Sequence, residues 1–338
     1  MKIVDKNIGN GEPTFIMVDA GINHCGSLSI AKKMIEEASN CNCDAVKFQT
    51  HLPESEMIRS NVTASYVKKD LFTLLKEVEL SKSDHFELRD CAKDNNIIFL
   101  STPFCIKAVD LLEEINVPAY KVGSGEMLNF PLIKRISETK KPVIISTGMS
   151  LIEEVKKLIT YADERLNDYS LLYCVSTYPT PYKDLNINVI QKLKQISNRP
   201  VGFSDHSVGI HSSLAAVALG ANIIEKHFTI SKKLPGPDQR ASINTKQLKN
   251  LVTQIRDIES SLGTEKIITT EEKEVRDMAY ESVTMNKSVN KGETLTSGMV
   301  SFKRPGTGIL PCDLQCVLGM KINKNLKKDE QLQWNDLE

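Results

Sequence analysis

Neither sign of charge predominates in this sequence. Lysine plus arginine and aspartate plus glutamate each number 43 among 338 residues, so the formal net charge is zero. Without a global field, the chain has no general attraction for nucleic acid or an anionic membrane, and an anionic ligand must be held by local charges. Membrane-spanning apolar runs are absent, and residues 1–13 contain charged side chains but no apolar signal-peptide core. We therefore expect a cytoplasmic protein.

Two further patterns are missing. The eight cysteines include no CxxC pair and are scattered over predicted helices and strands. In a chain without an export signal, this spacing predicts reduced structural thiols and neither disulfides nor a zinc site. No GxGxxG motif follows the first predicted strand, so a doubly wound open sheet ranks second among the α/β folds.

Residues 14–263 alternate short β-branched runs with longer amphipathic segments, which is the rhythm of βα repetition. The strand-like runs are 14–19, 45–50, 97–102, 119–123, 142–147, 170–176, 201–205 and 223–229. Helical spacing of apolar residues marks 27–40, 105–116, 151–166 and 245–263. Eight such units over about 250 residues predict a closed (β/α)8 TIM barrel.

The end of the chain differs in composition from the repeating part. Gly263 follows the last amphipathic segment as a helix C-cap does, and 264–281 is a charged connector that we predict to be helical. Residues 282–338 contain several turn glycines and no long amphipathic stretch. The sequence therefore predicts a barrel domain over 1–263, a linker over 264–281 and a small β-rich domain over 282–338.

Polar residues stand at the predicted C-terminal ends of all eight barrel strands, where the functional residues of such barrels gather. In strand order they are Asp19, Asn23 and His24; Lys47 and Gln49; Ser101 and Thr102; Lys121, Ser124 and Glu126; Ser146 and Thr147; Ser176 and Tyr178; Ser204, Asp205 and His206; Glu225 and His227. Solvation alone explains a polar residue at one strand end, but their coincidence on every strand predicts an active site.

His206 and His227 end neighbouring predicted strands, so both imidazoles can converge on one ion and leave positions open for water and substrate. A single histidine is more often a structural residue, but two on adjacent strand ends favour a metal site. Without clustered thiolates, the pair suits Mn²⁺, Mg²⁺ or another octahedral ion better than a structural zinc.

Lys47 and Lys121 lie inside apolar strand runs, where an unpaired ammonium is costly to bury. A buried carboxylate is one partner that satisfies them. The serines at Ser124, Ser146 and Ser204 instead suggest a ligand with a phosphate and a carboxylate. Two other classes of function stay open: a Schiff-base aldolase at Lys121, and a barrel that only binds carbohydrate.

Many ordered sequence blocks closely resemble N-acetylneuraminate synthases and the related legionaminic acid synthases. They are GINHCGS (21–27), KFQTH (47–51), FLSTPF (99–104), KVGSGE (121–126), ISTGM (145–149), YPTPY (178–182), FSDHS (203–207), EKHFT (225–229) and GPD (236–238). KGETLT (291–296), KRPGTGI (303–309) and VLG (317–319) resemble the SAF domain, which is related to type III antifreeze proteins. The GPD block favours the neuraminate and legionaminate branches over the pseudaminate branch.

The resemblance implies a condensation of phosphoenolpyruvate with N-acetylmannosamine to N-acetylneuraminate and phosphate, or with 2,4-diacetamido-2,4,6-trideoxymannose in a legionaminic acid synthase. It assigns phosphoenolpyruvate to Lys47, Thr102, Lys121, Ser124, Ser146 and Ser204, and Mn²⁺, with Mg²⁺ or Co²⁺ as alternatives, to His206 and His227. It assigns the open-chain sugar to Gln49, Glu126, Tyr178 and Asp238. It further implies a domain-swapped homodimer in which Arg304 binds the N-acyl group in the partner's barrel.

Two positions depart from the family pattern. Many bacterial members have Glu where this chain has Asp19, and many have Asn where it has Ser176. Asp19 keeps the charge on a shorter arm, whereas Ser176 lacks the amide donors and indicates a different ligand contact. Asp19 and Glu126 are both candidates for the general base, and the sequence does not choose between them.

Overall fold

The computed structural model describes residues 1–60 and 70–338 of the chain. It divides the chain into two compact units, Met1–Leu262 and Gly263–Glu338, each with its own apolar core.

The first unit is built on a barrel of eight parallel strands. They are β3 (Phe15–Gly21), β4 (Ala45–Thr50), β5 (Ile98–Pro103), β6 (Tyr120–Val122), β7 (Val143–Ser146), β8 (Tyr169–Cys174), β9 (Val201–Asp205) and β10 (Ile223–His227). Their order is β5-β4-β3-β10-β9-β8-β7-β6, and the end strands β5 and β6 contact each other, which closes the sheet. The predicted (β/α)8 barrel is confirmed, and every strand lies at a predicted strand-like run.

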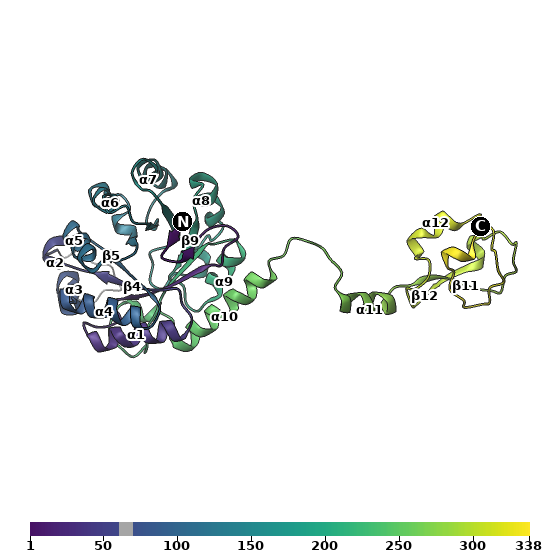
Figure 1. The fold of residues 1–338 in the computed structure, drawn as a ribbon, viewed down its shortest axis with the longest axis horizontal. Coiled ribbons are helices and arrows are strands. Elements are labelled where there is room, and N and C mark those ends of the chain that lie inside the picture. Colours follow the sequence, from purple (N-terminus) through teal and green to yellow (C-terminus); the bar gives the residue numbers. More distant parts are fainter. Residues whose placement is uncertain (61–69) are drawn as a thin grey trace. The chain divides into compact units, whose positions relative to one another are not determined.

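Helices surround the strands, as the first unit in Figure 1 shows. They are α1 (Leu28–Asn40), α2 (Pro53–Glu56), α3 (Leu71–Val78), α4 (Lys82–Asp94), α5 (Ile106–Ile115), α6 (Phe130–Ser137), α7 (Ile152–Arg165), α8 (Val189–Ser197), α9 (His211–Ala218) and α10 (Thr245–Ser261). Helix α10 illustrates how the sequence forms them. The Asn244 side chain caps its first turn, and the buried Leu248, Leu251, Val252 and Ile255 recur at three- and four-residue spacing.

The barrel interior is apolar and filled toward the N-terminal ends of the strands. A short N-terminal hairpin, β1 (Lys2–Ile3) and β2 (Lys6–Asn7), contributes the buried Ile3, and Ile8 follows it. These two side chains belong to one buried cluster with strand residues such as Phe15, Met17 and Leu100. Because apolar packing occupies this end, the polar strand residues gather at the other end, where the strands terminate.

The second unit has a small core around Val283, Leu295, Ile309 and Leu332. Strands β11 (Ser282–Met285) and β12 (Val300–Lys303) pair antiparallel, helix α11 (Thr270–Ala279) precedes them, and the short helix α12 (Leu314–Val317) follows.

All eight cysteines are free thiols. In the part of the chain that the structure describes, no helix combines the length and the apolar character needed to cross a bilayer.

Candidate functional site

A cavity of about 260 Å³ opens at the C-terminal ends of the barrel strands. The strand-end residues Asn23, His24, Ser101, Thr147 and Asp205 do not line it, whereas all of the candidate substrate, metal and general-base residues except Asp238 and Arg304 do. These are Asp19, Lys47, Gln49, Thr102, Lys121, Ser124, Glu126, Ser146, Ser176, Tyr178, Ser204, His206 and His227. The strand ends therefore converge as a barrel requires, and residues up to 208 positions apart in sequence face one space.

Lys47 lies on β4 beside Asp19 on β3, and the two residues are partners in the strand register. The Lys47 Nζ is 2.7 Å from Asp19 Oδ2 and 3.4 Å from the Thr102 hydroxyl. Burial acts to raise the pKa of Asp19, but the charges of Lys47 and His227 outweigh it and lower that pKa. Burial acts against the charged form of Lys47, and Asp19 and Glu225 overcome it, so its pKa is raised. Both groups are therefore ionised at neutral pH.

Lys121 is held differently, because no carboxylate of the described residues lies within hydrogen-bonding distance of it. Its Nζ donates to the Ser146 hydroxyl at 2.6 Å and to the Val122 carbonyl at 3.0 Å, while Glu225 Oε2 is 3.9 Å away. Burial lowers the pKa of Lys121 despite the attraction of Glu225. The positive charge of Lys121 is therefore less completely balanced by a nearby carboxylate than that of Lys47.

Glu225 on β10 is a central site residue that the sequence reasoning did not assign a role. Its Oε1 accepts a 2.7 Å hydrogen bond from Ser204, and its Oε2 lies 3.7 Å from the Lys47 Nζ. Burial acts to raise its pKa, but Lys121 and Lys47 lower it overall. The signal was present in the sequence: Glu225 stands two residues before His227 and so faces the same side of the strand.

The two histidines lie side by side, with ring centroids 5.4 Å apart. His206 Nδ1 lies 2.8 Å from the Val175 carbonyl, which can only accept, so Nδ1 carries the proton and Nε2 presents its lone pair. Burial, with a smaller effect of His227, lowers the pKa of His206 to about 4, which keeps it neutral. His227 Nδ1 is buried without a hydrogen-bond partner among the described residues. These donors fit a divalent ion.

The protein supplies few ligands for such an ion. Within residues 1–60 and 70–338, no group of three or more His, Cys, Asp or Glu side chains is arranged to hold a metal. An ion on the two imidazoles would therefore complete its coordination with water and substrate, as an open catalytic site requires, whereas a structural zinc site is closed by protein ligands.

Glu126 closes the short 3-10 turn Ser124–Glu126 that follows β6. Its Oε2 is buried and has no hydrogen-bond partner in the described part of the chain. Burial raises its pKa to about 7. The two candidate general bases therefore differ in protonation. Asp19 stays ionised beside Lys47, whereas Glu126 can exchange a proton near neutral pH.

Ser124 and Ser176 meet at the backbone of Gly148, where no side chain fits. A Cβ on Gly148 would lie 2.4 Å from the Ser176 hydroxyl, 2.7 Å from the Cys174 sulfur and 2.8 Å from the Ser124 hydroxyl. The Gly148 N–H donates to Ser124 at 3.0 Å. Cys174 is thus a buried cavity residue that the site prediction lacked.

A second cavity, of about 370 Å³, shares Gln49, Glu126, Tyr178 and His227 with the first. Asp238, in the 3-10 turn Asp238–Arg240, lines it, and burial raises the pKa of this carboxyl group. Its apolar lining consists of Ile22, Met57, Leu71, Leu74, Leu75, Phe104 and Pro237, and the polar His51 and Glu56 line it as well. The predicted sugar contacts Gln49, Glu126, Tyr178 and Asp238 therefore gather around one space with an apolar wall.

Arg304 is the one predicted site residue outside the barrel unit. It is exposed in the second unit, directly after β12. Its action in a partner's barrel stays a prediction.

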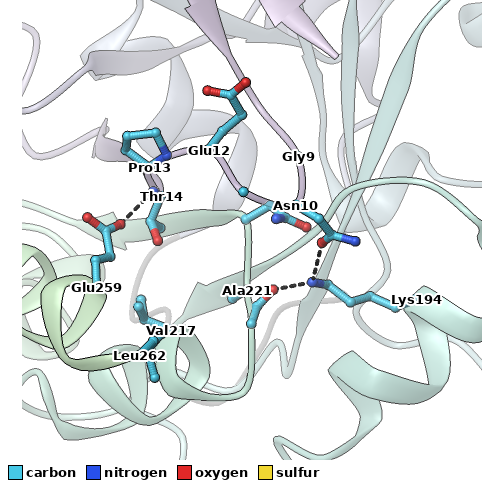
Figure 2. A pocket seen from close by; sticks show the side chains of 13 residues that line it. Gly9, Asn10, Glu12, Pro13, Thr14, Lys194, Val217, Ala221, Glu259 and Leu262 are labelled. Carbon is cyan, nitrogen blue, oxygen red and sulfur yellow. Dashed lines mark hydrogen bonds between the residues drawn. The ribbon is translucent and has the colours of Figure 1, made fainter. Parts of the chain in front are cut away.

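A larger cavity of about 460 Å³ lies at the opposite end of the barrel strands (Figure 2). Its charged groups already have partners within the protein. Lys194 donates to the Asn10 side chain and to the Gly220 carbonyl, and Glu259 accepts from the Thr14 N–H at 2.6 Å. Polar groups with internal partners leave little to bind a reactant, so the smaller cavity at the strand ends is the candidate active site.

Comparisons with known proteins identify the family of this chain. The NeuB family model matches residues 34–267, and the SAF domain model matches residues 280–338. N,N'-diacetyllegionaminic acid synthase of Campylobacter jejuni is 39% identical over 328 residues, which cover 94% of this chain and 98% of that protein. The Legionella pneumophila enzyme of the same name is 37% identical over 342 residues, covering 98% and 96%.

A solved structure shows the same architecture. The crystal structure of N-acetylneuraminic acid (sialic acid) synthetase from Leptospira borgpetersenii superposes with a TM-score of 0.75 at 34% identity, covering 81% of this chain and 94% of that one.

Proposed function

Because the chain belongs to the NeuB family, we propose that it condenses phosphoenolpyruvate with an N-acyl amino sugar and releases inorganic phosphate. Its relatives are named synthases, which makes it a transferase that forms a carbon–carbon bond. The Schiff-base alternative at Lys121 finds no support among them.

The observation that carries the proposal is the state of the two buried lysines. An ammonium group has three N–H donors. Among the described residues, Lys47 gives hydrogen bonds to Asp19 and Thr102, and Lys121 gives them to Ser146 and Val122. One donor on each lysine is left, and Glu225 stands beyond hydrogen-bonding distance of both. Two such donors with nearby serine hydroxyls suit the phosphate and carboxylate of phosphoenolpyruvate.

The reaction then follows from where charge develops. A divalent ion held by His206 and His227, Mn²⁺ by our expectation, would supply Lewis-acid polarisation of the sugar aldehyde. C3 of phosphoenolpyruvate attacks the aldehyde carbon, and the aldehyde oxygen takes up a proton to become a hydroxyl. Water adds at C2 and loses its proton to Glu126. The C2–O bond to the phosphoryl group then breaks as the new C2 hydroxyl passes its proton to the departing phosphate, which leaves a ketone. Lys47 and Lys121 hold the anionic groups throughout.

The apolar wall beside the sugar contacts favours one sugar. Ile22, Leu71, Leu74 and Phe104 offer surface to a deoxy carbon and acetyl methyl groups, and the polar His51 and Glu56 of the same cavity are already hydrogen-bonded to each other. We propose 2,4-diacetamido-2,4,6-trideoxymannose as the substrate, in agreement with the names of the Campylobacter and Legionella relatives. N-acetylmannosamine is the second candidate, because the Leptospira structure is that of a sialic acid synthetase.

Product analysis tests this choice. The enzyme is incubated with phosphoenolpyruvate, Mn²⁺ and each sugar in turn, and mass spectrometry identifies the nonulosonate formed. We expect kcat/KM to be about 10-fold or more higher for the diacetamido sugar, because one or two extra buried methyl groups contribute roughly 1–3 kcal/mol. Equal or better turnover of N-acetylmannosamine would reverse the assignment, and no phosphate release with either sugar would refute the condensation itself.

The pKa of Glu126 gives a second prediction. A base with a pKa of about 7 in the free protein must be ionised to act, so kcat/KM should fall as the pH decreases below about 7. Glu126→Gln should lower kcat by about 10²–10³ and remove this limb of the pH profile. Asp19→Asn is the matched control, and it should keep the limb because the Asp19 carboxylate is already ionised. The reverse result would make Asp19 the base.

We further propose that the chain acts in the cytoplasm as a domain-swapped homodimer. The exposed Arg304 of one subunit would then bind the N-acyl group of the sugar in the partner's barrel, for which a planar guanidinium is suited.

A further inference from the structure

A buried ion pair lies on the far side of strands β9 and β10 from the active-site cavity. Lys226 Nζ is 3.0 Å from Asp205 Oδ2, and their side chains are only 1% and 0% exposed. The two residues are partners in the β9–β10 register. Because successive side chains of a strand point to opposite faces, both project outward from the barrel toward helix α9. The proposed reaction uses neither of them.

The pair is part of a fully connected polar cluster. The Asp205 carboxylate accepts hydrogen bonds from the Ser207 N–H at 2.8 Å, the Ser207 hydroxyl at 2.6 Å and the Ser213 hydroxyl of α9 at 2.7 Å. Lys226 also donates to the Ser207 carbonyl. These bonds join the end of β9, the end of β10 and the first turn of α9 into one unit.

Each member of the pair stands between two cavity residues on its strand. Asp205 separates Ser204 from His206, and Lys226 separates Glu225 from His227. The Ser207 carbonyl held by Lys226 belongs to the residue directly after His206. The pair therefore fixes the two stretches of backbone from which both imidazoles project.

Stability alone does not account for this arrangement, since a buried ion pair is often no more stabilising than apolar side chains of the same volume. We propose that Asp205 and Lys226 are positioning residues that hold His206 and His227 at the separation needed to share one divalent ion. The inference rests on the proposed metal role of the two histidines.

The test uses the variant Asp205→Asn/Lys226→Met in the full-length protein. It removes both charges at nearly constant volume and leaves no unpaired charge in the interior, so the fold should persist with a thermal midpoint near that of the wild type. We expect its dissociation constant for Mn²⁺ alone, measured by calorimetry, to rise 10- to 100-fold, as is typical when residues that orient metal ligands are lost. Its crystal structure should show the two imidazole rings displaced from their 5.4 Å separation.

A second ion pair provides the matched control. The Lys141 Nζ, just before β7, lies 2.7 Å from Glu113 Oε1 on helix α5, and both side chains are half-buried. Neutralising them as Lys141→Met/Glu113→Gln should leave Mn²⁺ affinity unchanged. Wild-type affinity with unchanged ring separation in Asp205→Asn/Lys226→Met would overturn the proposal.

Two further outcomes are also decisive. If the wild type itself binds no Mn²⁺, the metal role fails, and unchanged ring separation in the double variant would overturn the positioning role as well. If the double variant does not fold, Ser213→Ala removes a single hydrogen bond to Asp205 and should weaken Mn²⁺ binding a few-fold. Unaltered binding by Ser213→Ala would then overturn the proposal.

Discussion

Replacing His206 with alanine is expected to lower kcat by about 10³ and to abolish activation by divalent ions. Lewis-acid polarisation of a carbonyl contributes several kcal/mol, and each 1.4 kcal/mol corresponds to a tenfold change in rate. The remaining imidazole, His227, gives a bound ion a single nitrogen ligand, so Mn²⁺ affinity should fall in parallel. Steady-state kinetics in chelator and in Mn²⁺, with a metal titration of the free protein, measure both effects.

Acid should weaken metal binding in a defined range. Because burial lowers the pKa of His206 to about 4, this imidazole stays neutral at pH 5 and above and becomes protonated as the pH falls through about 4. A protonated imidazole cannot ligate, so Mn²⁺ affinity should decline over that range. The control is His211→Ala, which replaces an exposed histidine outside the cavity and should behave as the wild type.

For the His206→Ala variant, full activity in chelator would refute the metal role.

Arg304→Ala mixed with His206→Ala is expected to recover about a quarter of the wild-type activity, although each variant alone is nearly inactive. If Arg304 acts in the partner's barrel, each heterodimer contains one site with both intact histidines and an intact arginine. Random pairing makes half of the dimers heterodimers with one active site of two. Activity of co-expressed chains, with heterodimers verified through two affinity tags, measures the recovery.

A matched mixture controls for partial activity of the variants. Co-expression of Arg304→Ala with the double variant Arg304→Ala/His206→Ala supplies no intact arginine in any dimer, so it should stay inactive. If Arg304 instead acts within its own chain, no heterodimer in the first mixture has a complete site. Verified heterodimers without activity would therefore exclude the swapped arrangement.

The barrel strands are predictable because their signal is local. A short run that is buried on both faces and bounded by polar segments indicates a strand, as AVKFQT does at β4 (Ala45–Thr50). The ends of strands are less predictable, because tertiary contacts decide them. The run 223–229 ends as a strand at His227, and Phe228 instead forms an isolated bridge to Ile243, a partner that no local pattern identifies.

The sequence predicts which residues form the site, but it does not predict which of them form ion pairs or hydrogen bonds with one another. Barrel topology places strand-end residues such as Lys47 and His206 in one cavity, so their identities follow from the sequence rhythm. The ion pair between Lys47 and Asp19 depends on the register of β4 against β3. The contrast between Asp19 and Glu126 depends on which carboxyl group is buried without a partner. Both are properties of the folded chain alone.

Phosphoenolpyruvate labelled with ¹⁸O in its bridging oxygen tests the central claim most directly. The labelled substrate is incubated with the enzyme, Mn²⁺ and the amino sugar, and mass spectrometry of the phosphate and the nonulosonate locates the label. Attack by C3 with water addition at C2 breaks the carbon–oxygen bond, so the account predicts the label in the released phosphate. Label retained in the sugar product would show phosphorus–oxygen cleavage and contradict the account.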